Sequence, residues 1–367
     1  MARGAVRRVG IIMTRLIRHV VRSLPTPDSA RLLAPAYGAS APSGEASRVA
    51  LAVESMSRHM TDEGWQLMLG LSHASYMLAG RRCDYDETDV RRILDALRPG
   101  TVVVQDKREW DVKDGEFRDD EARFTDVGAL CERQDVFKLT VLKDSHQRPA
   151  YHRESAEEMG VHGWVIYYHP DVVLRNAPYV RREHLVRTYH SLDPALVPEY
   201  GSVPRRSEAL LSGAVSGVYP LRTRLINNIE RLHIAKYVKH PGYHRAGCAT
   251  PGYLKTLAEY RVAICTSSIY GYALRKIVEA TACGCRVITD LPVDEVLPEI
   301  DGNLTRVAVD ISVREMRRLL KDLCETYRPE TQRAYAERAK TWYDYRATGQ
   351  RLAQDIETLR TSYANGS

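Results

Sequence analysis

Short continuous apolar runs alternate with helical patterns along most of the chain, and this alternation constrains the fold more than any other feature. In the first half the apolar runs lie at 48–55, 100–111, 137–147, 163–170 and 184–193. The segments between them, at 61–80, 87–100 and 153–163, have the apolar spacing of helices. Strands that are apolar throughout and alternate with helices are typical of a parallel sheet covered on both faces.

The same alternation begins again after residue 200, with apolar runs in 207–229, 234–244, 260–267, 285–292 and 305–312. A chain of 367 residues is long enough for about two domains. We therefore predict an α/β protein with two Rossmann-like domains that face each other across a cleft. The expected division is a basic extension and linker at 1–46, one domain at 47–200, a second at 201–345 and a C-terminal helix at 346–367.

Polar side chains gather where the strands of the first unit are predicted to end. The carboxyl ends of parallel strands line the ligand crevice of such a sheet, so these side chains are expected to form one site. A histidine beside an aspartate is able to act as a base near neutral pH. The alternatives are histidines that only support turns or the core, and a metal site, which no short ligand spacing supports. The candidate catalytic residues are Asp106, Asp144, His146, His169 and His190.

The stretch 260–290 predicts an anion-binding loop. It contains a strand, a polar loop, a helix over about Tyr272–Cys283, a glycine turn and another strand. A loop rich in Ser and Gly that opens a helix presents backbone N–H groups and the positive end of the helix dipole, which suits a diphosphate. The residues expected at this site are Ser267, Ser268, Tyr270, Gly271, Arg275 and Lys276.

Arg275 and Glu279 are four residues apart and therefore share one face of that helix. One interpretation is a helix ion pair, which stabilises a helix by only about 0.2–0.5 kcal/mol. The other is a pair of ligand-binding side chains. Gly284 in the turn after the helix and Asp290 at the next strand end favour the ligand interpretation.

The run from Glu279 to Ile288 reads E-A-T-A-C-G-C-R-V-I and resembles the E-A-x-A-C-G-x-P-V-I run in the donor half of GT-B glycosyltransferases. The group-1 and CgeB-like branch is the most similar, because an Arg four residues before the Glu is common there and Arg275 occupies that place. The sequence segments at 143–147, 167–170, 188–191 and 267–285 also resemble segments of glycosyltransferase-like proteins encoded by bacterial viruses. The local motif covers about thirty residues, and the two-unit architecture extends the resemblance loosely over 47–345.

This resemblance implies sugar transfer from a nucleotide-sugar, with no cofactor beyond that co-substrate and no metal. Glu279 would accept hydrogen bonds from ribose hydroxyls, and Arg222 would contact phosphate unless it is an ordinary surface arginine. The last helix would cross back to the first domain. The sequence departs from the family at Gly271, where retaining group-1 enzymes usually carry a second Glu, so Asp290, Asp294 or Glu295 is a candidate for part of that role. A nucleotide-sugar epimerase or hydrolase and a non-catalytic nucleic-acid-binding protein are the alternatives.

The net charge of +6 is concentrated at the N-terminus. Residues 1–46 carry seven arginines against Asp28 and Glu45, a net of +5, so the other residues sum to +1. The apolar spacing of 9–21 predicts a basic amphipathic helix suited to an anionic membrane surface or a nucleic acid. A poorly ordered tail and a cleaved signal are the alternatives. A globally basic nucleic-acid-binding surface is not supported.

The seven cysteines indicate a reducing, cytoplasmic environment, because most of them lie in apolar runs and their number is odd. Cys283 and Cys285 form a C-x-C pair without a second pair at zinc spacing, which favours packing over a metal site. The chain has no run of about 18 consecutive apolar residues, so no transmembrane helix is expected.

Overall fold

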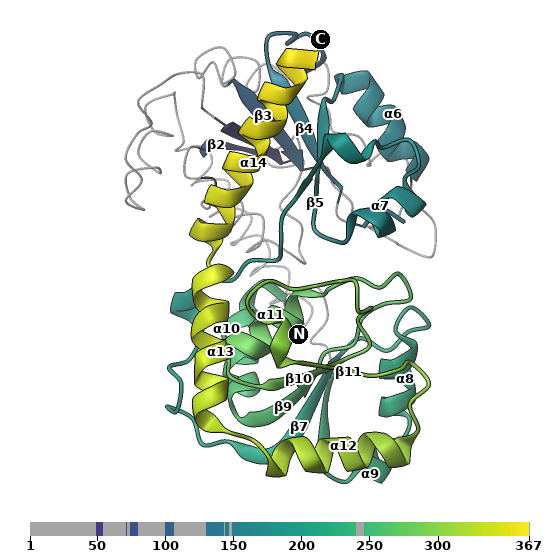
Figure 1. The fold of residues 1–367 in the computed structure, drawn as a ribbon, viewed down its shortest axis with the longest axis vertical. Helices are drawn as coiled ribbons and strands as arrows, with labels where there is room; N and C mark the ends of the chain where they lie inside the picture. Colours follow the sequence, from purple (N-terminus) through teal and green to yellow (C-terminus); the bar gives the residue numbers. More distant parts are fainter. Residues whose placement is uncertain are drawn as a thin grey trace, which may run out of the picture.

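The computed structural model shows two α/β lobes, one above the other in Figure 1. The residues that the structure describes are 49–53, 71, 74–79, 100–105, 130–142, 144–146, 149–239 and 246–366. The predictions made for residues 1–46, for the helix at 87–100 and for Asp106 therefore lie outside the described residues. In the described part, no helix is long and apolar enough to cross a membrane.

The N-terminal lobe is built on a parallel sheet of six strands in the order β2-β1-β3-β4-β5-β6. Both faces of its central strands are covered, since every residue of β4 and β5 is buried. This confirms the parallel sheet predicted from continuous apolar runs. The strands are β1 (Val49–Val53), β2 (Ala74–Ala79), β3 (Thr101–Gln105), β4 (Phe137–Leu142), β5 (Gly163–Ile166) and β6 (Leu185–Arg187).

One prediction in this lobe is wrong. The segment 61–80 was expected to be helical, but its last part is strand β2, which pairs in parallel with β1. The residues of this strand read ASYMLA, which is an apolar run too short to separate a strand from a buried helix by periodicity. Pairing with β1 decides the conformation, because a strand at the edge of a sheet gains its backbone hydrogen bonds from its neighbour.

The C-terminal lobe is built on a second parallel sheet, with the order β11-β10-β9-β7-β8. The first strand of this sheet is β7; the next strand, β8, pairs with one side of it, and β9 pairs with its other side. In open α/β sheets, ligands bind at the carboxyl ends of two strands between which the direction of winding changes in this way. The strands are β7 (Arg206–Gly213), β8 (Ala235–Lys239), β9 (Tyr260–Ile264), β10 (Arg286–Thr289) and β11 (Leu304–Arg306).

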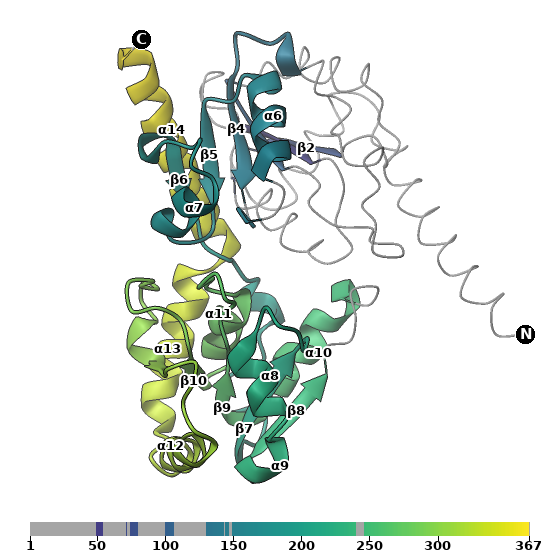
Figure 2. The ribbon, with the colours of Figure 1, turned by 90° about the vertical axis from the view of Figure 1, so that its right-hand side faces the viewer.

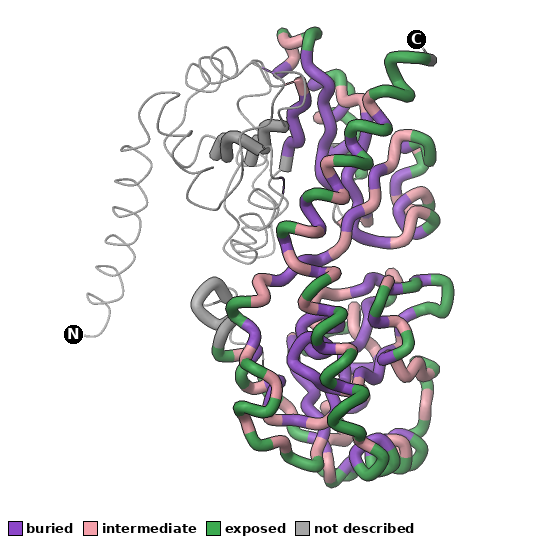
Figure 3. Tube along the Cα trace, turned by 60° about the vertical axis from the view of Figure 1, so that its left-hand side comes forward, coloured by how far each residue is buried: buried purple, intermediate pink, exposed green. Residues whose placement is uncertain are grey.

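Helices cover the two faces of the second sheet and enclose two apolar clusters. One cluster joins α10, α11 and α13 to the sheet, and the other joins α8, α9 and α12 to its opposite face. Figure 3 shows buried residues through the middle of each lobe and exposed residues on its outer helices and loops. The helices are α8 (Pro220–Ile226), α9 (Ile229–Leu232), α10 (Ala246–Ala258), α11 (Arg275–Ala282), α12 (Val313–Glu325) and α13 (Pro329–Trp342).

The chain crosses between the lobes twice, side by side. The segment after β6 pairs with the segment between α13 and α14 (Tyr345–Gly366), because the Leu192 N–H donates to the Tyr343 carbonyl at 2.9 Å and the Tyr345 N–H donates to the Leu192 carbonyl at 3.0 Å. From there α14 returns along the N-terminal lobe, where Leu352, Ile356 and Leu359 join its core (Figure 2). In the described part of that lobe, the other α-helices are α6 (Pro149–Met159) and α7 (Pro170–Asn176).

Candidate functional site

Two cations, buried Arg222 and partly buried Lys276, meet in the C-terminal sheet at the carboxyl ends of β7 and β9, between which the direction of winding changes. Arg222, on the helix that follows β7, reaches over to the end of β9, where its Nε donates to Thr266 Oγ1 at 3.0 Å. Lys276, on the helix that follows β9, reaches the opposite way and donates to the Ser212 carbonyl at the end of β7 at 3.0 Å. Each cation therefore lies on the helix that follows one of these strands and contacts the end of the other strand.

The charges of these two cations are not neutralised by an ion pair with any carboxylate of the described residues, although Asp290 and Glu279 lie near enough to act on them. Burial lowers the pKa of Arg222, and burial together with the nearby Arg222 charge lowers the pKa of the Lys276 ammonium from 10.5 to about 8. Within the described residues, the hydrogen bonds of both side chains go to neutral oxygens and neither side chain forms an ion pair. Two adjacent cations that are largely removed from water and have no ion-paired carboxylate form a site that an anion stabilises.

Gly213 makes room for this arrangement. Its φ of +120° is in the region that favours glycine, and a Cβ at this position would collide with Nζ of Lys276 and lie 2.7 Å from Nη1 of Arg222. The backbone of β7 is therefore bare where the two cations converge. A phosphate is able to approach bare backbone of this kind closely.

The polar loop after β9 lies beside the cations. The backbone N–H of Ser267 donates to the carboxylate of Asp290 at 2.5 Å, and the Oγ of Ser268 accepts from the N–H of Tyr270 at 3.2 Å. Burial raises the pKa of Asp290, while the Ser267 N–H opposes that shift. Asp290 thus fixes the start of the loop, and both serines are buried in it.

Helix α11 begins at Arg275, three residues later than predicted, because Tyr272 belongs to the loop. Leu274 occupies the N-cap position, and no side chain in this described segment caps the helix start. The Arg275 Nε lies 3.2 Å from the Glu279 Oε1, so the helix ion pair, which was the alternative to the favoured ligand interpretation, does form. Both side chains are nevertheless mostly buried at the edge that holds the cations, and Glu279 is only 7% exposed.

Tyr253 is a residue of this site that sequence reasoning missed. Its hydroxyl lies 2.8 Å from Ser212 Oγ, and burial, followed by the charges of Cys265 and Glu279, raises its pKa well above the ordinary value. The phenol therefore stays protonated and remains a hydrogen-bond donor. It lies on α10, where the sequence PGYLKTLAEY shows only a core-facing helix pattern, so no local signal marked it.

On the side of the N-terminal lobe, the candidate base His146 contacts two tyrosines of the β9–α11 loop. Its Nδ1 lies 2.9 Å from the hydroxyl of Tyr272, and its ring stacks on Tyr270 with the centroids 3.7 Å apart. Tyr272 in turn stacks flat on Tyr168 at 3.9 Å. Burial, helped by the nearby Asp144 charge, raises the pKa of Tyr272 to about 12, so its hydroxyl keeps its proton at neutral pH.

The other candidate catalytic residues are distributed around this cluster. His190 is buried beside Tyr167 and Tyr168, at centroid distances of 5.0 and 5.7 Å, so the structure brings it to the same aromatic cluster as His146. His169 instead caps α7, where its ring accepts a hydrogen bond from the N–H of Asp171 at 3.3 Å.

A buried ion pair forms a separate connection between the lobes. Arg187 at the end of β6 pairs with Glu295, which follows β10 and is 1% exposed. Burial raises the pKa of Glu295, whereas Arg187 opposes the shift. Two candidates for the role of the missing family glutamate are thus engaged elsewhere, Asp290 by Ser267 and Glu295 by Arg187.

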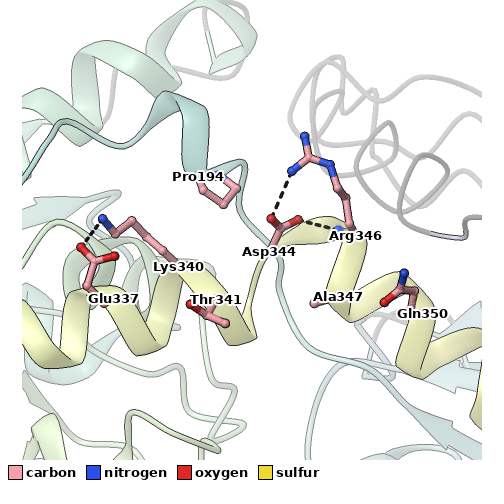
Figure 4. Close-up of a pocket in the computed structure, with 8 residues that line it drawn as sticks. All are labelled: Pro194, Glu337, Lys340, Thr341, Asp344, Arg346, Ala347 and Gln350. Atoms are coloured by element: carbon pink, nitrogen blue, oxygen red, sulfur yellow. Dashed lines mark hydrogen bonds and ion pairs between the residues drawn. The ribbon is translucent and has the colours of Figure 1, made fainter. Parts of the chain in front are cut away.

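A pocket of about 510 Å³ lies where α13 meets α14 (Figure 4). Its charged side chains neutralise each other in pairs, Lys340 with Glu337 at 2.5 Å and Arg346 with Asp344 at 3.1 Å. It therefore lacks the unneutralised positive charge of the Arg222 and Lys276 site. Across the described ranges, no group of three or more His, Cys, Asp or Glu side chains is placed to hold a metal ion.

No family model and no curated protein matches the sequence. Among solved structures, sucrose-phosphate synthase from Thermosynechococcus elongatus is 8% identical with a TM-score of 0.51, over 87% of this chain and 100% of that one. HepE from Anabaena, solved with UDP and glucose, is 11% identical with a TM-score of 0.48, over 86% of this chain and 100% of that one. The pneumococcal O-GlcNAc transferase GtfA, solved with UDP and GlcNAc, is 13% identical with a TM-score of 0.43, over 75% of this chain. The chain spans 60% of the length of that transferase. The likeness to sucrose-phosphate synthase shows the fold alone: the two parallel-sheet lobes of this chain have the α/β fold of glycosyltransferases of the GT-B type.

Proposed function

We propose that the chain is a glycosyltransferase that takes a sugar from a nucleotide-sugar. The observation that carries the proposal is that Arg222 and Lys276 converge on Gly213, which has no side chain, at the strand ends where the direction of winding changes. A nucleoside diphosphate supplies the negative charge that this site lacks, and the start of α11 adds the positive end of a helix dipole. The UDP bound to the Anabaena and pneumococcal proteins supports a ligand of this class.

The proposed reaction breaks the bond between the anomeric carbon and the diphosphate oxygen and forms a bond from that carbon to an acceptor hydroxyl oxygen. The bonding electron pair leaves with the nucleoside diphosphate. Arg222 and Lys276 stabilise the charge that develops there, as fixed donors aimed at a leaving group do. The acceptor proton passes to a base on the N-terminal lobe, and we propose His146 with Asp144 for that role.

The other residues of the site contact the rest of the donor and the acceptor in this proposal. Glu279 accepts hydrogen bonds from the ribose, and the loop of Ser267, Ser268, Tyr270 and Gly271 encloses the donor, with Arg275 beside it. His190 and His169 line the acceptor side. We also propose that the reaction needs no metal, that the chain is most similar in function to the group-1 and CgeB-like branch and its viral relatives, and that it acts in the cytoplasm. The acceptor class that we propose is a modified nucleic-acid base, a glycan or a surface polymer.

Binding of a donor tests the proposal directly. In a thermal-shift screen against UDP-, GDP-, ADP- and TDP-sugars, at least one should stabilise the protein, by about 2.7 kcal/mol at 100 times its Kd. Arg222→Ala and Lys276→Ala should each weaken binding of that donor at least about tenfold, because each leaves a charged phosphate without its partner. Glu279→Gln should weaken binding and leave the fold intact.

Arg224→Ala is the matched control. Arg224 lies on the same helix two residues from Arg222, but its guanidinium donates to the carbonyls of Val309, Asp310 and Ile311. This variant should lose thermal stability and keep the donor affinity of the wild type. A protein that no nucleotide-sugar stabilises, or Arg222 and Lys276 variants that bind as the wild type does, would contradict the proposal. Consumption of the donor without any acceptor would instead indicate an epimerase or hydrolase.

A further inference from the structure

Tyr272 belongs to the C-terminal lobe by sequence and to the N-terminal lobe by packing. It lies between β9 and α11, yet its side chain is 2% exposed within the apolar core that contains Val141, Val165 and Tyr168. We propose that Tyr272 is a positioning residue, which fastens the donor-binding loop to the N-terminal lobe and holds the His146 ring at the junction of the lobes. The kinetic part of this inference rests on the proposed function, whereas the fastening does not.

The hydroxyl of Tyr272 is fully satisfied by the opposite lobe. It lies 2.9 Å from Nδ1 of His146, 3.2 Å from Oγ of Ser145 and 3.4 Å from Nδ2 of Asn176. A phenol has one proton to donate and two lone pairs, so three partners fill its capacity. Asn176 also donates to Ser145 at 3.2 Å, which makes the contact a connected network. Such a network favours one geometry over others.

The rings of this contact fix orientation as well as distance. Tyr272 stacks on Tyr168 with an interplanar angle of 4°, and Tyr270 from the same loop stacks on His146 with an angle of 20°. His146 is therefore held by a ring face from one tyrosine and by a hydroxyl from another. Both constraints come from a single loop of the C-terminal lobe, so the orientation of His146 depends on that loop.

The same loop reaches the donor site within a few residues. The Gly271 N–H donates to the Ser268 carbonyl at 2.9 Å, and Ser267 is fixed by Asp290. On the other side, Tyr272 lies three residues before the start of α11, which carries Lys276. A movement of Tyr272 away from its partners would therefore displace the anion-binding loop and His146 together.

The ion pair between Arg187 and Glu295 also joins the lobes, but its hydrogen bonding is incomplete. Within the described residues, Nε of Arg187 and Oε2 of Glu295 have no hydrogen-bond partner although both are buried. A buried ion pair that leaves some of its hydrogen-bonding atoms without partners offsets little of the free energy that its desolvation costs. Tyr272 carries no net charge, its hydroxyl has three partners in the opposite lobe, and it lies in the β9–α11 loop itself, whereas Glu295 follows β10.

Hydrogen exchange of the full chain tests the fastening without any donor. Tyr272→Phe keeps the stacking and removes the hydroxyl, so amide exchange over 266–274 and 144–146 should become about fivefold faster or more. Tyr200→Phe is the matched control, because it also removes a hydroxyl with two partners, Tyr327 Oη and the Pro329 carbonyl, both at 2.9 Å and both in the C-terminal lobe. This control should leave exchange in the two segments at the wild-type rate.

Ser145→Ala approaches the same contact from the other lobe and should speed exchange in the same two segments. Wild-type exchange in both Tyr272→Phe and Ser145→Ala would overturn the inference, and so would acceleration confined to one lobe. In turnover with a nucleotide-sugar that binds, Tyr272→Phe should lower kcat about tenfold and raise the KM of the donor by a smaller factor, because the loop that it releases also contacts the donor, and its pH–rate profile should shift. If transfer occurs and exchange does not respond, the inference fails and the proposed function stands. If exchange responds and no donor binds, the proposed function fails and the fastening stands.

Discussion

The surroundings of Lys276 change the pKa of its ammonium group strongly. On an exposed helix face a lysine stays charged far above neutral pH, but here burial and Arg222 lower its pKa to about 8. The sequence marked Lys276 as a candidate because it follows the polar loop. Its contact with Ser212, 64 residues away, was outside the reach of a local pattern.

This pKa predicts how donor affinity depends on pH. Below about pH 8 Lys276 is charged and attracts a diphosphate, whereas above it the free protein loses that proton. Binding an anion raises the pKa again, so binding takes up a proton above pH 8 and affinity should fall as the pH rises toward 10. Isothermal titration at several pH values, in buffers of different ionisation enthalpy, measures both the fall and the proton uptake.

Lys276→Arg is the control for this pH dependence. A guanidinium keeps its charge over the whole range, so the fall above pH 8 should disappear in the variant even if its affinity is lower. Equal affinity of the wild type at about pH 7 and 9.5 would show that Lys276 does not bind the ligand.

The β9–α11 loop is the element that joins the two halves of the proposed site, and its path depends on Gly271. This residue has a φ of +72°, and a Cβ there would lie 3.1 Å from Cγ of Pro292. The glycine replaces the second glutamate expected from the family resemblance. The structure gives a physical reason, because the turn at this position lets the tyrosines on both sides contact the opposite lobe.

Gly271→Ala should lower the free energy of unfolding by about 1–2 kcal/mol, the usual strain of an L-residue in the left-handed region. Because the loop carries the donor site, donor affinity should fall as well. Urea denaturation and thermal shift with the donor measure the two effects. Gly217→Ala, at an exposed position with no atom within 4 Å of the added Cβ, should change neither quantity by more than about 0.5 kcal/mol. An unchanged Gly271→Ala variant would mean that the turn tolerates a side chain.

At the scale of the whole molecule, charge is divided between the α/β lobes and the N-terminal extension. Deleting residues 1–46 removes +5 of the net +6. The truncated protein should therefore elute from a heparin column at lower salt, since fewer counterions are released on binding a polyanion. Donor affinity should stay the same, because both cations of the proposed anion site lie in the C-terminal lobe.

A full-length variant with the seven arginines of this segment replaced by Gln separates charge from chain length. It should elute with the truncated protein. Elution of either protein at the wild-type salt concentration would assign polyanion binding to the two lobes. Loss of soluble protein on truncation would show that the segment is part of the folded core.

The sequence alone determined the two parallel sheets and the polar loop before α11. Continuous apolar runs such as 137–142 and 260–264 are local consequences of burial on both faces of a sheet, so they can be read without the fold. The edge strand β2 was mistaken for a helix because its short apolar run carries no period, and pairing with β1 decided it.

Only the tertiary structure decided which side chains meet. Arg222 contacts Thr266 across 44 positions, and Tyr272 contacts Ser145 across 127. Such contacts leave no period in the sequence, because they depend on the order of strands in a sheet and on the packing of one lobe against the other. Because β9 lies beside β7 rather than beside β8, the helices that follow β7 and β9 are neighbours. This arrangement brings Arg222 and Lys276 together at Gly213. The local pattern thus fixed where polar loops occur, and long-range packing fixed which of them form one site.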